Sequence, residues 1–389
     1  MEVKKPMKMR LVLAPDSFKG SLSAKEFCTI ASLALKEALP MAEIHSFPCS
    51  DGGEGAIDAI LHNLSGERIL VNTTDPLGRP IQAAYGLLDD GTAILELAQA
   101  SGLPLIESNQ KDPARATTRG TGVLVLDALR KGCHHLVFCL GGSATIDGGI
   151  GILAELGAQF FDEFGQQISP NPFGLHKLKR LDLSKMDRRI LETKVTVLTD
   201  VTNPLLGKNG AVNTYGPQKG VSQEEIPFFE DALRNFHTQT CYHLGVDQEK
   251  QPGTGAAGGA GYGLSTYLNG RIQTGFSWIS AKLRLEATIQ ETKPHIIITG
   301  EGRFDHQSMQ GKVVGEMIRL GHQYRIPVIA LCGSLQPGWE ESKEKCGQFV
   351  ALSITPMDSS VRMALTNAGP NLRAACLKLS PNILKYHQE

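Results

Sequence analysis

Strand-like and helix-like segments alternate along this chain, and that alternation limits the possible folds more than any other feature. Residues 9–14 form an apolar run that predicts a buried strand, and residues 24–39 follow with the apolar spacing of a helix. The order then repeats, with a strand pattern over residues 43–47 and a helix pattern over residues 56–64. Such an order is typical of an α/β protein with a parallel sheet.

The pattern changes between residues 67 and 98, where three strand-like runs are separated by hairpin-type turns. This region predicts an antiparallel patch. Further strands are predicted near the end of the chain, at residues 295–299, 328–331 and 349–354. We therefore expect two α/β domains. One is discontinuous, with a parallel sheet, and comprises residues 1–66 and 292–389; the other is inserted, comprises residues 67–291 and includes the antiparallel strands.

Composition excludes several classes of protein. The 389 residues carry a net charge of −1, so the chain lacks the positive charge of a general nucleic-acid binder. No apolar run approaches the ~18–20 residues of a membrane-spanning helix. The eight cysteines form no C-x-x-C pair, so neither a zinc ribbon nor a dithiol redox motif is indicated. Scattered cysteines of this kind predict reduced thiols, and we expect a cytoplasmic protein.

Glycine is over-represented, at 42 of 389 residues, against an ordinary share of ~7%. Many of these glycines gather in five polar segments, each beginning where a predicted strand ends. The five segments are residues 14–21, 50–55, 141–151, 199–204 with 216–220, and 299–308 with 311–312. Ligands of open parallel sheets bind beyond the carboxyl ends of the strands. We therefore expect these segments to face a common cleft.

The residues in these segments are suited to phosphate chemistry. Backbone N–H groups of Gly141–Ser143, ahead of a helix predicted over residues 149–156, could cradle phosphate oxygens with help from the helix dipole. The accompanying charged residues are the cations Lys19, Lys219, Arg303 and Lys312 and the carboxylates Asp16, Asp51, Asp147, Asp200 and Asp305. Carboxylates hold Mg²⁺ or accept a hydroxyl proton. Together these are the parts that phosphoryl transfer needs.

Simpler interpretations compete with some of these assignments. An aspartate at the end of a strand is often a helix cap or a turn former, so a structural role stays open for Asp147 and Asp200. Residues 253–258 match the dinucleotide spacing G-x-G-x-x-G, but they follow a polar segment and not a strand, and we reject that motif. Gly311-Lys312 is followed by Val313, so it is not part of a P-loop.

Six segments, in order and with similar spacing, resemble the signature blocks of the bacterial glycerate kinase family. They are residues 16–21 (DSFKGS), 51–55 (DGGEG), 141–149 (GGSATIDGG), 217–220 (PQKG), 252–259 (PGTGAAGG) and 299–308 (TGEGRFDHQS). The similarity extends from about Met9 to the C-terminus. It departs at Ile146, where the family usually has Asn or another small polar residue, and at Thr254, where Ala is common.

This resemblance implies an ATP- and Mg²⁺-dependent kinase that phosphorylates D-glycerate at C2 to give 2-phosphoglycerate, in the cytosolic breakdown of glyoxylate, glucarate or galactarate. It also implies two α/β domains, one of them discontinuous and Rossmann-like or flavodoxin-like. Phosphorylation at C3, or of a related hydroxy acid, stays open, as does a non-catalytic sensor of glycerate or nucleotide. We expect a monomer or a homodimer.

The expected site residues fall into four groups. The catalytic group is Asp305, Asp51, Lys19, Arg303 and Lys312, with Asp305 or Asp51 as the base. The nucleotide-binding group is Gly141, Gly142, Ser143, Thr145 and Lys219. The substrate-binding group is Asp16, Ser17 and Ser308, and the metal-binding group is Asp51 and Asp200. Whether each cation meets the glycerate carboxylate or a phosphate stays open.

Overall fold

The computed structural model describes residues 8–309, 311–337 and 349–383. The chain divides into two units. Unit 1 comprises the residues up to Asp51, Asp58–Leu64, and the residues from Phe276 onward. Unit 2 comprises Gly52–Ile57 and Ser65–Gly275. Helices α10 (Gly275–Lys282) and α11 (Leu285–Thr292), which the sequence analysis placed in the inserted domain, thus lie almost entirely in unit 1.

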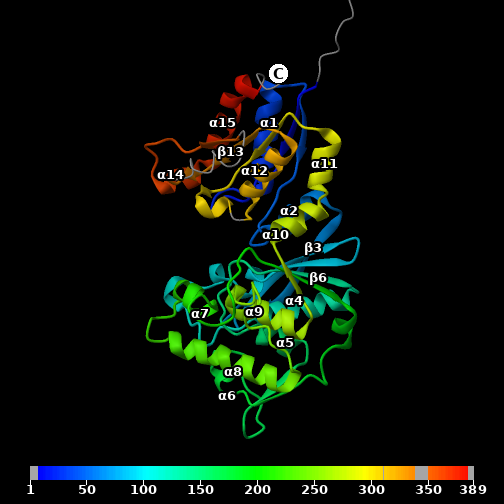
Figure 1. The fold of residues 1–389 in the computed structure, drawn as a ribbon, viewed down its shortest axis with the longest axis vertical. Helices are drawn as coiled ribbons and strands as arrows, with labels where there is room; N and C mark the ends of the chain where they lie inside the picture. The colour runs from blue at the N-terminus through cyan, green and yellow to red at the C-terminus, as the bar shows by residue number, and fades with distance from the viewer. Residues whose placement is uncertain (1–7, 310, 338–348, 384–389) are drawn as a thin grey trace, which may run out of the picture. The chain divides into compact units, whose positions relative to one another are not determined.

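Unit 1 is built on a five-stranded, fully parallel sheet (Figure 1). Its strands, in spatial order, are β15 (Phe349–Ser353), β13 (Val328–Cys332), β11 (Ile296–Thr299), β1 (Arg10–Leu13) and β2 (Glu43–Ser46). Leu11 pairs with Ile296, so the two ends of the chain meet in the middle of this sheet. The three central strands β1, β11 and β13 are short, largely buried runs, as parallel strands covered by helices usually are, whereas the edge strand β2 is partly exposed.

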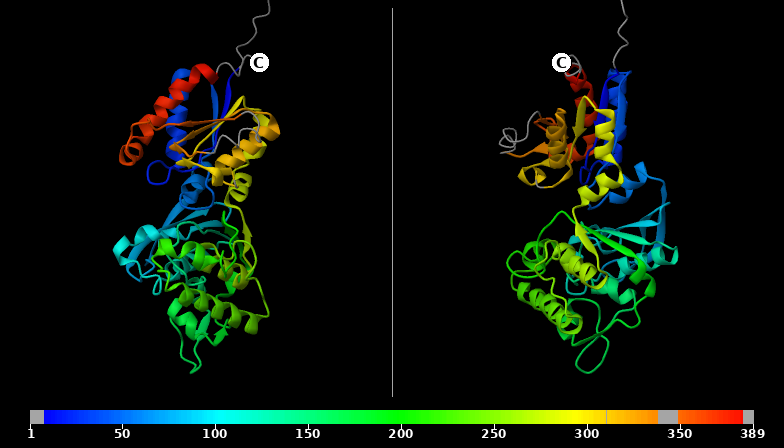
Figure 2. Two further views of the ribbon diagram at one scale, coloured as in Figure 1. Left: turned by 60° about the vertical axis from the view of Figure 1, so that its left-hand side comes forward. Right: turned by 45° about the vertical axis from the view of Figure 1, so that its right-hand side comes forward.

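Helices cover both faces of this sheet (Figure 2). On one face α1 (Ala24–Ala38) and α15 (Ala368–Ile383) share an apolar core that includes Phe27 and Leu372. On the other face α11 and α12 (Val313–Tyr324) pack around residues such as Met317. The remaining elements are α2 (Ala56–Asn63), α14 (Val361–Thr366) and a small parallel pair, β12 (Arg303–Phe304) with β14 (Ser334–Leu335).

Unit 2 contains a mixed six-stranded sheet. Its strands, in spatial order, are β10 (Arg271–Gln273), β9 (Lys194–Leu198), β6 (His135–Cys139), β5 (Thr92–Glu96), β4 (Pro80–Leu88) and β3 (Gly66–Thr74). The pairs β3–β4 and β4–β5 are antiparallel, and the others are parallel. The antiparallel patch expected from the sequence is therefore confirmed, as is the α/β class of the whole chain.

The helices of unit 2 are α3 (Ala98–Ser101), α4 (Arg119–Arg130), α5 (Ile150–Glu155), α6 (Pro172–Lys177), α7 (Ala211–Tyr215), α8 (Ile226–Leu244) and α9 (Ala256–Tyr267), and a small antiparallel pair joins β7 (Gln159–Phe161) to β8 (Arg180–Asp182). Aromatic side chains of α8 and α9 meet in the core, where Phe236 and Tyr262 have ring centroids 5.7 Å apart. Ala257, Gly258 and Gly259 have positive φ, so the chain bends sharply at the start of α9.

Residues 361–383 form two helices, α14 and α15, which separate at Asn367, so that Pro370 falls in the first turn of α15. A proline there removes no helical hydrogen bond, because the first N–H groups of a helix have no partner within it. Among the described residues, no helix combines the length and the apolar character needed to cross a bilayer.

Candidate active site

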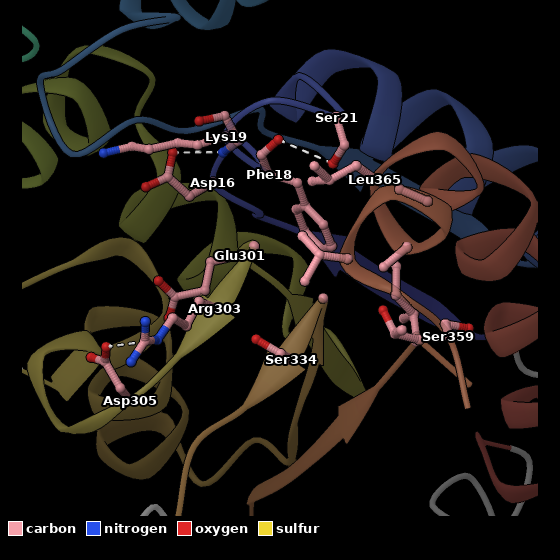
Figure 3. A pocket seen from close by; sticks show the side chains of 18 of the residues that line it. Asp16, Phe18, Lys19, Ser21, Glu301, Arg303, Asp305, Ser334, Ser359 and Leu365 are labelled. Atoms are coloured by element: carbon pink, nitrogen blue, oxygen red, sulfur yellow. Dashed lines mark hydrogen bonds and ion pairs between the residues drawn. The ribbon is translucent and has the colours of Figure 1, made fainter. Parts of the chain in front are cut away.

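Unit 1 contains a cavity of about 470 Å³ at the carboxyl ends of its parallel strands (Figure 3). The segment after β1 contributes Asp16 to Lys19, and the segment after β11 contributes Glu301 to Asp305. Gly333 and Ser334 enter from the end of β13. This is the position at which open α/β sheets bind their ligands.

Backbone pairing between β1 and β11 continues beyond the strands and fixes the first two segments. Ala14 N–H donates to the Ile298 carbonyl at 2.9 Å, and Asp16 N–H donates to the Gly300 carbonyl at 2.8 Å. At Gly300 a Cβ atom would lie 2.1 Å from the carbonyl oxygen of Leu331, so only glycine fits. Asp16 and Glu301 are thereby held beside each other by the sheet itself.

Three carboxylates of this cavity are almost buried. The exposed fractions are 8% for Asp16, 9% for Asp51 and 8% for Glu301. Burial raises the pKa of Asp16 well above its ordinary value, and the charges of Asp51 and Glu301 raise it further. The hydrogen bond from Ser17 N–H to Asp16 Oδ1, 2.6 Å long, acts in the opposite direction. Three carboxyl groups therefore lie together in one buried part of the cavity.

Glu301 was not among the residues chosen from the sequence. Burial raises its pKa to about 7, although its hydrogen bond with Ser308 and the charge of Lys312 both lower it. Its buried Oε1 atom has no hydrogen-bond partner within the described part of the chain. The one available signal was its place directly after a strand, between Gly300 and Gly302.

Three of the four predicted cations line the same cavity. Lys19 lowers the pKa of Asp16, and Lys312 lowers that of Glu301, so both charges act on the buried carboxylates. Arg303 is mainly exposed, and its Nε lies 3.6 Å from Asp305 Oδ2. Basic side chains beside carboxylates are the arrangement expected where an anionic ligand and a metal meet.

The turn after β12 connects Asp305 with Ser308. Asp305 N–H donates to Ser308 Oγ, and Ser308 N–H donates to the Asp305 carbonyl oxygen, both at 3.0 Å. Ser308 is fully buried, so it lies behind the cavity wall and does not line it. The structure thus brings together Asp16, Ser17, Lys19, Asp51, Arg303, Asp305 and Lys312 around one cavity.

The opposite wall of the cavity is apolar. Its side chains come from the segment after β15 and from α14 and the start of α15, and they are Ile354, Val361, Ala364, Leu365 and Ala368. Figure 3 shows Leu365 on this wall and Asp16, Glu301 and Arg303 on the other. A ligand with one apolar and one anionic part would match both walls.

The predicted nucleotide-binding residues lie in unit 2. Gly142 has φ +71°, and a Cβ atom there would lie 2.3 Å from Glu54 Oε1. Beneath this turn the buried Lys219 Nζ donates to Ser143 Oγ at 2.7 Å and to the Thr145 carbonyl at 2.8 Å. Burial lowers the pKa of Lys219 to about 7. The structure therefore brings Lys219 together with the Gly141–Thr145 turn.

The helix predicted over residues 149–156 is α5 (Ile150–Glu155), and its N-terminus is occupied by Asp147. The fully buried Asp147 carboxylate accepts hydrogen bonds from Thr118 N–H at 2.7 Å, Gly149 N–H at 3.1 Å and Gly151 N–H at 3.3 Å. These bonds show Asp147 as a structural cap. Asp200 is exposed just beyond the end of β9 in unit 2.

A family model described as the glycerate kinase family matches residues 11–383. The chain is 40% identical to glycerate 2-kinase of Escherichia coli K12 over 328 residues, which cover 84% of this chain and 86% of that protein. It is 36% identical to glycerate kinase of Halalkalibacterium halodurans, covering 95% and 97% of the two chains. A crystal structure from Salmonella typhimurium LT2, assigned as glycerate kinase 2, superposes with a TM-score of 0.86 at 35% identity and covers 98% of this chain and 100% of its own. The chain belongs to the glycerate kinase family and is a phosphotransferase with an alcohol group as acceptor.

Proposed function

We propose that this protein transfers the γ-phosphate of ATP to the C2 hydroxyl of D-glycerate, giving 2-phosphoglycerate. The observation that carries the proposal is the cavity of unit 1, in which three cations and several carboxylates surround a space suited to a small anionic substrate. The name of the Escherichia coli relative, glycerate 2-kinase, supports phosphorylation at C2. Kinase catalysis of this type rests mainly on positioning and charge stabilisation.

The cations and the base have separate tasks in this proposal. Lys19, Arg303 and Lys312 hold the glycerate carboxylate and the transferred phosphoryl group. Asp305 accepts the proton of the attacking hydroxyl. It is suited to this task because its carboxylate is 28% exposed at the cavity wall, while the Ser308 hydroxyl fixes its backbone. Asp16 and Ser17 orient the substrate from the neighbouring strand end.

The donor set of the cavity fits Mg²⁺. Asp16, Asp51 and Glu301 are buried carboxylates, the charge of Asp51 raises the pKa of both Asp16 and Glu301, and Glu301 Oε1 has no hydrogen-bond partner among the described residues. Hard oxygen ligands of this kind are what Mg²⁺ prefers. We propose Asp51 as its main protein ligand, and the expected part of Asp200 in metal binding stays a prediction of the sequence. The ion would supply positive charge to the phosphate oxygens, while Asp305 moves the proton.

For the nucleotide we propose the turn Gly141–Thr145. The buried charge of Lys219 lies directly beneath the turn and fixes it through Ser143, which supports a site for anions. The buried Thr145 Oγ1 has no hydrogen-bond partner among the described residues, so it can serve a ligand. A cytoplasmic location and a monomeric or homodimeric state stay predictions of the sequence.

One assay tests the reaction. The purified chain is incubated with ATP, Mg²⁺ and D-glycerate, ADP release is followed with coupling enzymes, and the product is examined by phosphorus NMR. The proposal expects ADP release and the resonance of a 2-phosphate. A 3-phosphate resonance would move the reaction to C3, and a preference for another hydroxy acid would replace the substrate. If no hydroxy acid causes ADP release, the result would favour a non-catalytic sensor.

A further inference from the structure

A histidine and a cysteine lie one turn apart at the end of helix α8. His237 and Cys241 are four residues apart and therefore share one face of the helix. The helix ends at Gly245, which adopts a left-handed conformation with φ 66° and donates its N–H to the Cys241 carbonyl at 2.9 Å. This C-cap turns the chain back, so that Asp247 returns to the face that carries the other two side chains.

The three side chains have the spacing of a metal site. Cys241 Sγ lies 3.6 Å from His237 Nε2, and Asp247 Oδ1 lies 3.7 Å from the same nitrogen. All three ligand atoms lie within 4.8 Å of one another. Zn–N, Zn–O and Zn–S bonds of about 2.0–2.3 Å in a tetrahedron place ligand atoms roughly 3.3–3.6 Å apart. A zinc ion would therefore fit with small side-chain movements.

The histidine is oriented by a residue behind it. His237 Nδ1 forms a hydrogen bond of 3.1 Å with the hydroxyl of Tyr262, which is fully buried in α9. A histidine that binds metal through one ring nitrogen usually donates the N–H of the other to a partner of this kind. The bond to Tyr262 thus occupies Nδ1 and leaves Nε2, the nitrogen nearest Asp247 Oδ1, for a metal, while Cys241 Sγ lies 3.6 Å from both ring nitrogens.

The charges around the cluster favour a cation. Asp247 and the neighbouring Glu249 bring negative charge close to Cys241. The Cys241 thiol donates a hydrogen bond of 3.2 Å to the Val246 carbonyl oxygen. The side chain of Asp247 is 77% exposed, so ions can enter from solvent and a water molecule can take the fourth coordination position.

We propose that His237, Cys241 and Asp247 bind one Zn²⁺ ion. Imidazole and thiolate ligands together select zinc over the harder Mg²⁺. On binding, the S–H bond of Cys241 breaks, its proton passes to solvent, and the sulfur electron pair forms the bond to zinc. One thiolate and one carboxylate then neutralise the dication. The ion fastens the segment between α8 and α9 to the end of α8, and it takes no part in phosphoryl transfer.

Cobalt titration of the full chain tests the proposal. Co²⁺ is added to metal-free protein, and the thiolate-to-cobalt charge-transfer absorption is recorded. We expect saturable binding of one ion per chain, displacement by Zn²⁺, and loss of the absorption in Cys241→Ser and His237→Asn. The matched control is His243→Asn. This histidine is on the same helix but bonds the Lys179 carbonyl at 3.2 Å, so the variant should bind as the wild type does.

A second measurement needs no variant of the three ligands. Cys241 is half-buried, while the other described cysteines are buried, so in a Cys346→Ser background, which removes the cysteine outside the described residues, an alkylating reagent should label Cys241 first. Zn²⁺ should slow this labelling at least tenfold and raise the melting temperature by several degrees, because it binds the folded chain. Cobalt absorption that persists in Cys241→Ser, or labelling of Cys241 that is unchanged by Zn²⁺, would overturn the proposal.

Discussion

The buried hydroxyl of Ser308 hydrogen-bonds the carboxyl of Glu301, which joins the end of β11 to the turn that follows β12. The same hydroxyl accepts the backbone N–H of Asp305 at 3.0 Å. A single oxygen atom thus contacts the carboxyl group of Glu301 and fixes the backbone of Asp305. Changes at Glu301 and at Asp305 should consequently affect the reaction more than the fold.

Replacing Glu301 by Gln should lower kcat by about 10²-fold or more, since an amide keeps the shape but neither accepts a proton nor binds Mg²⁺ well. Steady-state kinetics at saturating ATP and D-glycerate measure the effect. Glu316→Gln is the matched control, because Glu316 pairs with Arg319 on α12 at 2.8 Å. A Glu301→Gln enzyme with the turnover of this control would exclude the residue from the site.

The same substitution should change how stability depends on pH. The ordinary pKa of a glutamate is 4.5, and burial raises that of Glu301 to about 7. Between these values the folded protein binds more protons than the unfolded one, so Glu301 makes stability fall as pH rises. Above pH ~7 the cost is complete, at roughly 1–3 kcal/mol. Glu301→Gln should therefore melt higher than the wild type at pH 8, in a buffered thermal scan, and less so at pH 5.

Asp305→Asn should lose ~10²–10⁴-fold in kcat, as expected for a general base. Its melting temperature should change little, because the Asp305 backbone makes two hydrogen bonds with Ser308 that the substitution keeps. Both quantities should be measured on one preparation. Near-normal turnover with a lowered melting temperature would make Asp305 structural, and the role of base would pass to Asp51.

Gly142→Ala should weaken ATP binding about tenfold or more, because the new Cβ would lie 2.3 Å from Glu54 Oε1 and must displace this side chain or the turn. Isothermal titration calorimetry measures the affinity. Gly165→Ala is the control, since Gly165 also has positive φ, at 75°, but no atom within 4 Å of its added Cβ. Equal ATP affinity in two folded variants would count against the turn as the nucleotide site.

Asp147→Asn should act on stability and not on chemistry. The new amide would direct N–H groups at donors such as Gly149 N–H or Thr118 N–H, at a cost of about 1–3 kcal/mol. The melting temperature should fall by several degrees, while kcat stays close to normal at low temperature. Asp162→Asn, in an exposed turn, should leave both unchanged. A stable variant with lost turnover would place Asp147 in the reaction.

Local patterns predicted much of the fold. The strands predicted at residues 9–14, 43–47 and 295–299 lie in one parallel sheet. The first and the last are apolar runs of the length of a buried strand, which is why local pattern predicts them. The antiparallel region was predicted by its turns. No local pattern in the sequence marks Phe276 as the residue at which the chain returns to unit 1. That boundary depends on which hydrophobic core α10 and α11 join.

The chemistry of the site was less accessible from the sequence. The high pKa of Glu301 results from burial by residues far away along the chain, which no local pattern encodes. The same holds for the approach of Glu54 to Gly142. In the zinc cluster the spacing of His237 and Cys241 is visible in the sequence, but the return of Asp247 depends on the backbone conformation of Gly245.

The position of β1 between β2 and β11 has a consequence for biosynthesis. The ribosome adds about 5–20 residues per second, and domains tend to fold as they emerge. Strand β1 is made early, but β11, which pairs with it through Leu11 and Ile296, follows only after the whole of unit 2. The edge of β1 that pairs with β11 therefore has no partner strand on the nascent chain until β11 is made. Unit 2 can mature first, and a pause in translation before β11 would lengthen the time during which that edge is open to aggregation or to a chaperone.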